Sequence, residues 1–371
     1  MRFFAKTKAS VLIILCIVFL GGPAFPADTK VPVIHAKGTH YEAGYQIGTH
    51  MKVQLNEIIQ SSKEYVEKKM DVSWEDIRAQ SQIFLEFSKK HMPEYVEEIR
   101  GAADAAGIDQ VDLFSDLCEE IFSENYIKGC SDLIASGDVT ADGSVLAAHN
   151  NDTGPELEKY AVVVHYEVEG EPEILAVGYG GLGISFGYNS EGISLTGNEL
   201  SMNDMKMGVP RMLLVRKILA ARTMGEAIDA AIFQPRASNY NQVISDADGE
   251  IYSIESSATD YEAIYAEEGY LVHTNHYVSP RMRKYELDRQ DITTSMFRYN
   301  RANRLMKNNK GRISVDLLKS FLQDHANRPA SICRHGKEVK TTLSVIINLT
   351  TKTMFLARGN PCESTYYEYT F

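Results

Sequence analysis

The sequence predicts an α+β fold in which helices cover the faces of mostly antiparallel sheets. Three observations support this prediction. Residues 39–123 carry apolar side chains at three- and four-residue spacing, the period of a helix. After Gly129 the pattern changes to short apolar runs separated by glycine-rich turns, which is typical of strands. From Cys130 onward, blocks of strands and pairs of helices follow one another, and the lack of regular strand–helix alternation argues against a doubly wound parallel sheet.

The helical segment has clear start and stop signals. Ser73 and Asp109 stand where N-caps are expected, each before an apolar-periodic run. Pro93 opens another helix, as proline does in a first turn, and Gly107 closes it. The expected helices cover 39–70, 73–91, 93–107 and 109–122, after a short strand over 31–38.

The second part of the chain contains two Asp-Gly pairs between apolar runs, which indicate tight hairpins. They are Asp142-Gly143 and Asp248-Gly249. Further strands are expected over 160–168, 173–180, 183–189, 192–200 and 261–277, with a closing hairpin over 341–359. Helix pairs are expected at 210–222 with 223–233, and at 293–308 with 314–325.

The first 27 residues read as a secretory signal peptide. Arg2, Lys6 and Lys8 precede a short apolar core, 11–20, and small residues follow. Gly22 with Ala24, or Ala27, suits a cleavage site. The apolar core is short for a bilayer span, so a retained anchor is disfavoured. We therefore expect a secreted or periplasmic protein with no stable membrane insertion after leader removal.

Composition is that of an ordinary globular protein, with 371 residues, 44% hydrophobic and 24% charged. The net charge is −12, and removing a leader with three basic and no acidic residues leaves about −15. A surface this acidic does not favour nucleic acid or anionic membranes as partners. Solubility is the simplest reason for such a charge.

Several motifs are absent from the sequence. There is no GxxxxGK[ST], no HExxH, no paired CxxC and no GxSxG. The densest histidine pair is HTNHY, His273–Tyr277, in a segment expected to be strand or loop, where metal binding is disfavoured. We expect neither a cofactor nor a metal.

Cysteine 130 follows a glycine at the junction of the helical and strand segments. With the leader removed, Cys118, Cys130, Cys333 and Cys362 remain, an even number that is compatible with two disulfides in an exported protein. Cys130 is open to three interpretations: an inert buried side chain, which is the usual fate of cysteine, half of a disulfide, or a nucleophile. If it is a nucleophile, at most one disulfide forms.

An N-terminal-nucleophile mechanism would explain the glycine. The Cys130 thiol would attack the Gly129 carbonyl, the amide would shift to a thioester, and hydrolysis would leave Cys130 as a new N-terminus. Its α-amine, with a reference pKa of about 7.7–8.0, would serve as base for its own thiol. Glycine removes the Cβ that would obstruct this attack.

Four further polar residues lie where they could serve such a site. Asn151 and Asp152 follow the expected hairpin, although Asn-Asp is equally typical of a turn. Asn275 would suit an oxyanion donor or, more commonly, a turn cap. Arg334 would bind a carboxylate or polarise Cys130, and the usual alternative is a surface salt bridge.

The chain resembles the acyl-coenzyme A:6-aminopenicillanic acid acyltransferase (isopenicillin N acyltransferase-like) family of Ntn hydrolases, which is related to the choloylglycine hydrolases. The resemblance rests on seven stretches spread in order over nearly the whole mature chain. These are GTHYEAGYQIG (Gly38–Gly48), PEYVEEIRGAADAAGI (Pro93–Ile108), GCSDL (Gly129–Leu133), NND (Asn150–Asp152), GYNSEGISLTGNEL (Gly187–Leu200), HTNHY and DHANRPASICRH (Asp324–His335).

The resemblance implies a four-layer αββα Ntn-hydrolase sandwich with a helical N-terminal segment. It also implies autocleavage between Gly129 and Cys130, with 28–129 as a small subunit that stays associated with 130–371, the large one. The implied site residues are Cys130 as nucleophile, Asp152 beside it, Asn275 and Asn198 at the oxyanion, and Arg334 as the site arginine, with Arg298 and Arg301 as competitors for that role.

One departure concerns the substrate. His149 stands where the bile-salt hydrolases carry an arginine, which disfavours bile-salt specificity. The resemblance implies a secreted amidohydrolase that takes a small-molecule N-acyl substrate through an acyl-cysteine thioester. Two alternatives remain: an acyltransferase that uses an amine acceptor, and an unprocessed binding protein with an inactive site.

Overall fold

The computed structural model describes residues 29–122, 129–287 and 292–371. The expected leader, 1–27, and Lys128 lie outside the described residues. No helix within the described ranges has the length and apolar character needed to cross a bilayer.

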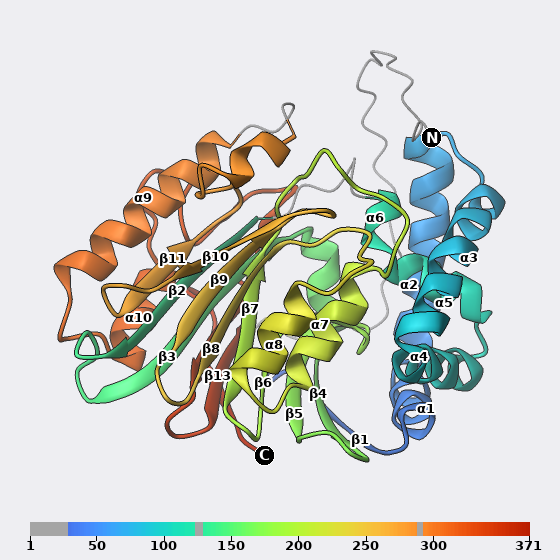
Figure 1. Cartoon of the computed structure of the whole chain (residues 1–371), viewed down its shortest axis with the longest axis horizontal. Helices are drawn as coiled ribbons and strands as arrows, with labels where there is room; N and C mark the ends of the chain where they lie inside the picture. Colours follow the sequence, from blue (N-terminus) through green and yellow to red (C-terminus); the bar gives the residue numbers. More distant parts are fainter. Residues whose placement is uncertain (1–28, 123–128, 288–291) are drawn as a thin grey trace.

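Two sheets form the middle of the molecule (Figure 1). The eight-stranded sheet is antiparallel except where β1 pairs with β4 in parallel. Its order is β1 (Val33–Gly38), β4 (Ala161–Val168), β5 (Ile174–Tyr179), β6 (Gly183–Asn189), β7 (Ile193–Asn198), β8 (Asn241–Asp246), β9 (Ile251–Ser256) and β10 (Tyr261–Tyr265). The six-stranded sheet has the order β11 (Tyr270–His273), β2 (Gly129–Gly137), β3 (Gly143–Thr153), β12 (Lys340–Asn348), β13 (Thr353–Arg358) and β14 (Tyr367–Tyr369).

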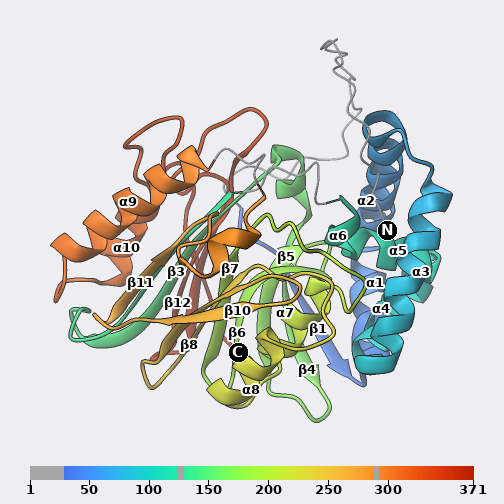
Figure 2. The ribbon, with the colours of Figure 1, turned by 45° about the horizontal axis from the view of Figure 1, so that its top comes forward.

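Helices cover the outer face of each sheet, and Figure 2 shows them on opposite sides of the strands. The helices on the side of the eight-stranded sheet are α1 (His40–His50), α2 (Lys52–Tyr65), α3 (Trp74–His91), α4 (Pro93–Ala106), α5 (Gln110–Leu117), α6 (Glu119–Phe122), α7 (Arg211–Leu219) and α8 (Met224–Ala231). Among them α1, α7 and α8 pack against the strands, and α3 packs against α4, α5 and α6. The six-stranded sheet is covered by α9 (Thr293–Asn308) and α10 (Val315–Leu322). Short helical turns occupy Val66–Met70, Pro155–Tyr160 and Met282–Tyr285.

Three apolar cores join these four layers. One lies between the helices and the eight-stranded sheet, the second between the two sheets, and the third between the six-stranded sheet and α9 with α10. Alternate residues of β2 divide between the second and third cores: Ile134 faces the other sheet, whereas Leu133 faces α9 and α10. The predicted αββα sandwich with an N-terminal helical segment is confirmed.

The local signals read from the sequence also hold. Ser73 accepts a hydrogen bond from the backbone N–H of Asp76, and Asp109 caps α5. Gly107 ends α4 with a left-handed φ of 73°. The Asp142-Gly143 turn joins β2 to β3, with Gly143 at a φ of 79° that glycine adopts without strain. The hairpin places Gly129, the first residue of β2, opposite Asp152, near the end of β3.

Three expected runs divide. The helix expected over 39–70 separates into α1, α2 and the turn Val66–Met70, and the helix expected over 109–122 separates into α5 and α6. The strands expected over 261–277 separate into β10, at the edge of the eight-stranded sheet, and β11, at the edge of the six-stranded sheet. The chain therefore crosses between sheets at 266–269, a crossing that apolar alternation alone does not reveal. As a result Asn275, just beyond β11, lies beside the start of β2.

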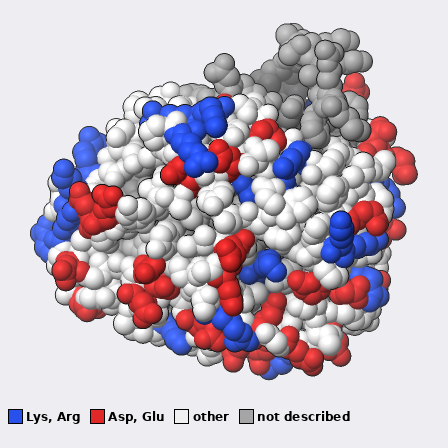
Figure 3. Space-filling model, viewed as in Figure 1, with Lys and Arg blue, Asp and Glu red and all other residues white. Residues whose placement is uncertain are grey.

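Acidic and basic side chains are interspersed over the face drawn in Figure 3. Many charged side chains of the described residues form pairs, such as Arg281 with Asp260 and Glu262. The acidic net charge predicted to disfavour nucleic acid is thus spread over the surface seen there rather than gathered in one patch.

Candidate active site

Cys130 lies at the start of β2, an interior strand of the six-stranded sheet, and only 6% of its surface is exposed. Gly129 pairs with Asp152 of β3, and Cys130 pairs with Asn151. Successive residues of a strand point to opposite faces. Cys130 therefore faces the other sheet, and Gly129 faces α9 and α10 on the opposite side of the strand.

On the face toward α9 and α10, Gly129 is packed against charged groups. A Cβ placed on Gly129 would lie 2.5 Å from Arg334 Nη1 and 3.0 Å from Asp152 Oδ2. These two groups form a loose ion pair, with Nη1 and Oδ2 3.9 Å apart. A side chain at position 129 would therefore collide with these groups, which is a packing reason for glycine in addition to the chemical one.

The Asp152 carboxyl is fully buried. Its Oδ1 accepts a hydrogen bond of 2.7 Å from Thr341 Oγ1, while Oδ2 has no hydrogen-bond partner in the described part of the chain. Burial raises the pKa of Asp152, and the charges of Arg334 and Arg298 oppose that rise. A carboxyl with one free oxygen next to Gly129 is able to accept or hold a proton there.

The backbone of Cys130 is held by an asparagine and an arginine. Its N–H donates to Asn275 Oδ1 over 2.8 Å. Arg298, from α9, donates through Nη1 to the Cys130 carbonyl and through Nη2 to Asn275 Oδ1, the latter at 2.7 Å. The Asn275 amide donates in turn to the Glu199 carbonyl at 3.2 Å. Both ends of the Cys130 backbone are therefore fixed by a fully buried guanidinium and amide.

On the face between the sheets, His149 and Asp132 form a buried pair. His149 Nδ1 lies 2.7 Å from Asp132 Oδ1, and both side chains are fully buried. Burial opposes the charge on the imidazole, but the Asp132 carboxylate and the nearby Cys130 raise the pKa of His149 to about 10. Its Nε2 makes no hydrogen bond to any described residue. A charged imidazole thus lies beside the cysteine.

Asn198 lies at the end of β7, where the two sheets approach each other. Its Oδ1 accepts from Asn241 Nδ2 at 3.0 Å and lies 2.9 Å from His273 Nδ1. Its Nδ2 is buried and has no partner among the described residues. An amide held through its oxygen with its N–H₂ group unused is suited to donate a hydrogen bond to an oxygen that develops negative charge. A small cleft starts at the next residue, Glu199, and is lined by Glu119, Glu120, Glu199, Leu200, Ser201, Met202, Met205, Ser238, Tyr240 and Leu287.

The structure thus brings together most of the residues named from the sequence. Cys130, Asp152, Asn275 and Arg334 surround the Gly129–Cys130 bond. Of the two competing arginines, Arg298 contacts Cys130 and Asn275 directly. Arg301, one helical turn along α9 from Arg298, instead pairs with Asp324 at 2.6 Å.

Sequence reasoning noticed His149 only as a departure and missed Asp132. The missing signal was the two-residue strand period, because Asp132 follows Cys130 by two and His149 pairs with Asp132 across the hairpin. All four cysteines within the described residues carry free thiols in this structure.

Comparisons with known proteins show which family the chain resembles. The family described as acyl-coenzyme A:6-aminopenicillanic acid acyl-transferase matches residues 139–363, a range that begins after Cys130. The β-alanyl-dopamine/carcinine hydrolase of Drosophila melanogaster is 26% identical over 231 residues, 56% of this chain and 58% of that protein. The acyl-coenzyme A:6-aminopenicillanic-acid-acyltransferase 40 kDa form of Emericella nidulans is 23% identical over 322 residues, 85% of this chain and 88% of that protein. The chain thus spans little more than half of the first relative's length.

Two solved structures are similar at low sequence identity. A mutant conjugated bile acid hydrolase from Clostridium perfringens is 13% identical, with a TM-score of 0.40 over 65% of this chain and 97% of that one. Penicillin V acylase from Agrobacterium tumefaciens is 11% identical, with a TM-score of 0.40 over 62% of this chain and 83% of that one. The family match, which covers more than half of the chain, confirms the resemblance predicted from the sequence.

Proposed function

The chain belongs to the acyl-coenzyme A:6-aminopenicillanic acid acyltransferase family, and from this premise we propose that it is an autoproteolytic amidohydrolase with Cys130 as its nucleophile. The observation that best supports the proposal is the fixed backbone of Cys130. Its N–H donates to Asn275, and its carbonyl accepts from Arg298. The same hydrogen bond to Asn275 would orient a free α-amine after cleavage.

Self-processing would begin with attack of the Cys130 sulfur on the Gly129 carbonyl carbon. The C–N bond breaks, the thiol proton passes to the departing amine, and a thioester links Gly129 to the sulfur. Water then hydrolyses this thioester, which leaves a carboxylate on Gly129 and a free amine and thiol on Cys130. The unpartnered oxygen of Asp152 lies on the Gly129 side of the bond, where it could carry a proton between these groups.

Substrate turnover would use the same groups. The Cys130 amine takes the thiol proton, the sulfur attacks the carbonyl of an N-acyl substrate, and the proton passes to the leaving amine. The unused amide of Asn198 and the amide of Asn275 would donate to the oxyanion. The charged His149, which lies with Cys130 on the face between the sheets, would stabilise the thiolate. Water would then release the acid from the acyl-cysteine.

The proposal is tested by following the Gly129–Cys130 bond. Purified wild-type protein is expected to give two bands on a denaturing gel, the larger starting at Cys130, whereas Cys130→Ala stays uncut. Amide hydrolysis by Cys130→Ala is expected to fall by at least about 10³-fold, because the nucleophile and its base are lost together. A wild-type chain that remains whole would contradict the proposal and favour the alternative of an unprocessed binding protein. Cleavage of Cys130→Ala at Gly129 would point to an external protease.

An acyltransferase is the second candidate, since one of the relatives is named for that activity. Residues 1–27 resemble a leader for export, and outside the cytoplasm an acyl-coenzyme A donor is scarce, which favours water as acceptor. Product analysis with and without an added amine distinguishes transfer from hydrolysis. The screen should include N-β-alanyl amines and penicillins, after the relatives' names, together with N-acyl amino acids, acyl-homoserine lactones and bile-salt conjugates.

A further inference from the structure

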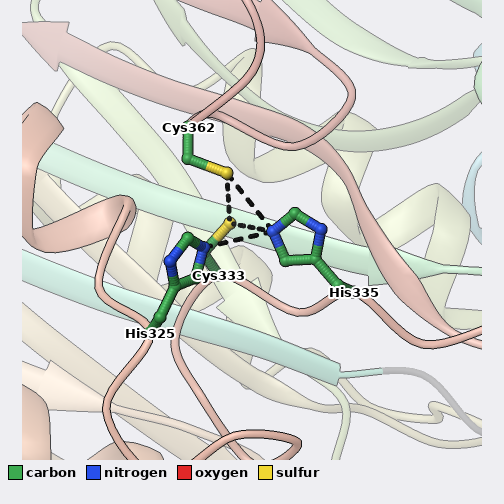
Figure 4. Close-up of side chains that lie close together, drawn as sticks. All are labelled: His325, Cys333, His335 and Cys362. Carbon is green, nitrogen blue, oxygen red and sulfur yellow. Dashed lines mark hydrogen bonds between the residues drawn. The ribbon is translucent and has the colours of Figure 1, made fainter.

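Two cysteines and two histidines converge in the loops that follow α10 and β13. His325, Cys333 and His335 come from one loop, and Cys362 comes from the other (Figure 4). Their four ligand atoms all lie within 4.8 Å of one another. Cys333 is buried and Cys362 is exposed, so the cluster reaches from the interior to the surface.

Four of the six distances between these atoms are close to the edges of a small tetrahedron, and the other two, from the His325 nitrogen to the sulfurs, are at most 4.8 Å. His335 Nε2 lies 3.1 Å from His325 Nε2, 3.4 Å from Cys333 Sγ and 3.2 Å from Cys362 Sγ, and the two sulfurs are 3.6 Å apart. A tetrahedral zinc with Zn–S of about 2.3 Å and Zn–N of about 2.0–2.1 Å requires edges of about 3.3–3.8 Å between ligand atoms. The observed contacts therefore need to open by only a few tenths of an ångström, roughly, to admit the ion.

The surroundings also suit a metal–thiolate site. Asn360 Nδ2 lies 3.5 Å from Cys333 Sγ, as a hydrogen-bond donor to a thiolate would. The Nδ1 atom of His335 faces the Glu363 carboxylate at 3.9 Å, which leaves Nε2 directed at the cluster. A shallow pocket lined by Arg328, Pro329, Ser331 and His335 opens beside the cluster and gives an ion a path from solvent.

We propose that His325, Cys333, His335 and Cys362 form a structural site for a divalent zinc ion. Zinc prefers tetrahedral nitrogen and sulfur ligands, and four protein ligands leave no open position for catalysis. Binding would release the two thiol protons to solvent and leave two thiolates that balance the charge of the ion. A Cys333–Cys362 disulfide would account for the two sulfurs but not for the two imidazole nitrogens at the same point.

The site would also hold an active-site side chain in place. Arg334 stands between two of the ligands, Cys333 and His335, and its guanidinium reaches Asp152 and Gly129 on the other side of the loop. The metal would tie this loop to the one that carries Cys362. Metal content does not depend on whether the chain cleaves itself, so this inference can fail while the proposed function stands, and the reverse.

The test is metal content of the full chain, expressed with added zinc and purified under a non-chelating reductant. Elemental analysis of wild type is expected to give about one zinc per chain, and Cys362→Ser and His325→Ala are each expected to lose most of it. Both changes are at the surface end of the cluster, so the variants should fold. Cys118→Ala, which removes a buried thiol among the N-terminal helices, is the control and should keep its zinc.

Cobalt replacement of the zinc should give a thiolate-to-metal absorption band and the visible spectrum of a tetrahedral ion, absent in Cys362→Ser. Three outcomes would overturn the proposal. One is zinc retained in both ligand variants. Another is a wild-type protein without metal whose intact mass, for a sample prepared without reductant, shows a Cys333–Cys362 disulfide. The third is a wild-type protein with free thiols that binds neither zinc nor cobalt.

Discussion

Gly129 and Cys130 are neighbours in the chain, but the groups around them differ in kind. Gly129 faces Asp152 and Arg334, a loosely paired carboxyl and guanidinium in contact with loops. Cys130 faces the space between the sheets, where His149 and Asp132 form a tight and fully buried pair. Under the proposed function, the strand would separate groups that act on the Gly129 carbonyl from groups that set the charge near the sulfur, so substitutions on the two faces should have distinguishable effects.

Arg298 should give the largest effect of the residues that surround this bond, because it holds the Cys130 carbonyl and Asn275 together. A lysine keeps the charge but lacks the fork that reaches both acceptors. Losing a charge-assisted hydrogen bond costs about 1.5–3 kcal/mol, so Arg298→Lys should slow Gly129–Cys130 cleavage by about 10–100-fold. The measurement is the rate at which freshly translated chain separates into two bands.

Arg301→Lys is the matched control, one turn along the same helix. Arg301 pairs with Asp324 rather than with the site, and a lysine can still form that pair. Equal cleavage rates for wild type and Arg298→Lys would mean that this guanidinium does not position the Gly129–Cys130 bond. Arg298 would then not connect the groups on the two faces of the strand.

Gly129→Ala should give a smaller effect that is confined to the outer face. The new Cβ would displace the Arg334 guanidinium from its place beside Asp152, and because the end of an arginine is flexible, the chain should still fold. We expect cleavage to slow by roughly 10-fold, about the value of one hydrogen bond to a charged group. Gly225→Ala, in a helix with open space around it, is the control and should cleave normally.

The clash with Arg334 can be tested separately by combining Gly129→Ala with Arg334→Ala. If displacement of the guanidinium is the cause, the double variant should be no slower than Arg334→Ala alone. Additive losses would instead place the obstruction in the path of the sulfur, on the Cys130 side.

Most of the architecture, although not the crossing between the sheets at 266–269, could be predicted from the sequence because the signals for it are local. Ser73, Pro93, Gly107 and Asp109 act within a few residues, and each cap formed as expected. The hairpin predicted at Asp142-Gly143 likewise formed, although a register shift between Ala135 and Gly137 separates the turn from the pairs that bring Asp152 opposite Gly129. Local signals of this kind are legible because capping and turn chemistry do not depend on distant packing.

The site was only partly predictable because its contacts join distant segments. Arg298 reaches Cys130 from a helix 168 positions away, and nothing in its own neighbourhood distinguishes it from Arg301. The proposed zinc ligands are also far apart in the sequence. Cys362 comes close to His325 because β12 pairs with β13, and no CxxC spacing in the sequence indicates this.

The inner face can be tested on its own through the dependence of stability on pH. The pKa of His149 rises from an ordinary 6.5 to about 10, so the folded state binds this proton more tightly than the unfolded state does. The stability that it contributes is therefore fully present below about pH 6.5 and is lost as the pH rises toward 10. The groups that face this imidazole are Asp132, Cys130 and the ring of Phe186, and Asp152 adds a more distant charge from the other face of the sheet.

Asp132→Asn should remove most of this dependence, because the carboxylate is the main cause of the rise. Melting temperature measured at one scan rate should fall less between pH 6.5 and 10 in the variant than in wild type. His276→Gln is the control of opposite sign, because burial lowers the pKa of His276 to about 4. That histidine favours folding more as the pH rises from 4 to 6.5, so its loss should change the acid limb alone. If Asp132→Asn and wild type lose stability equally above pH 6.5, His149 is not held as an imidazolium, and the charge assigned to the inner face must come from another group.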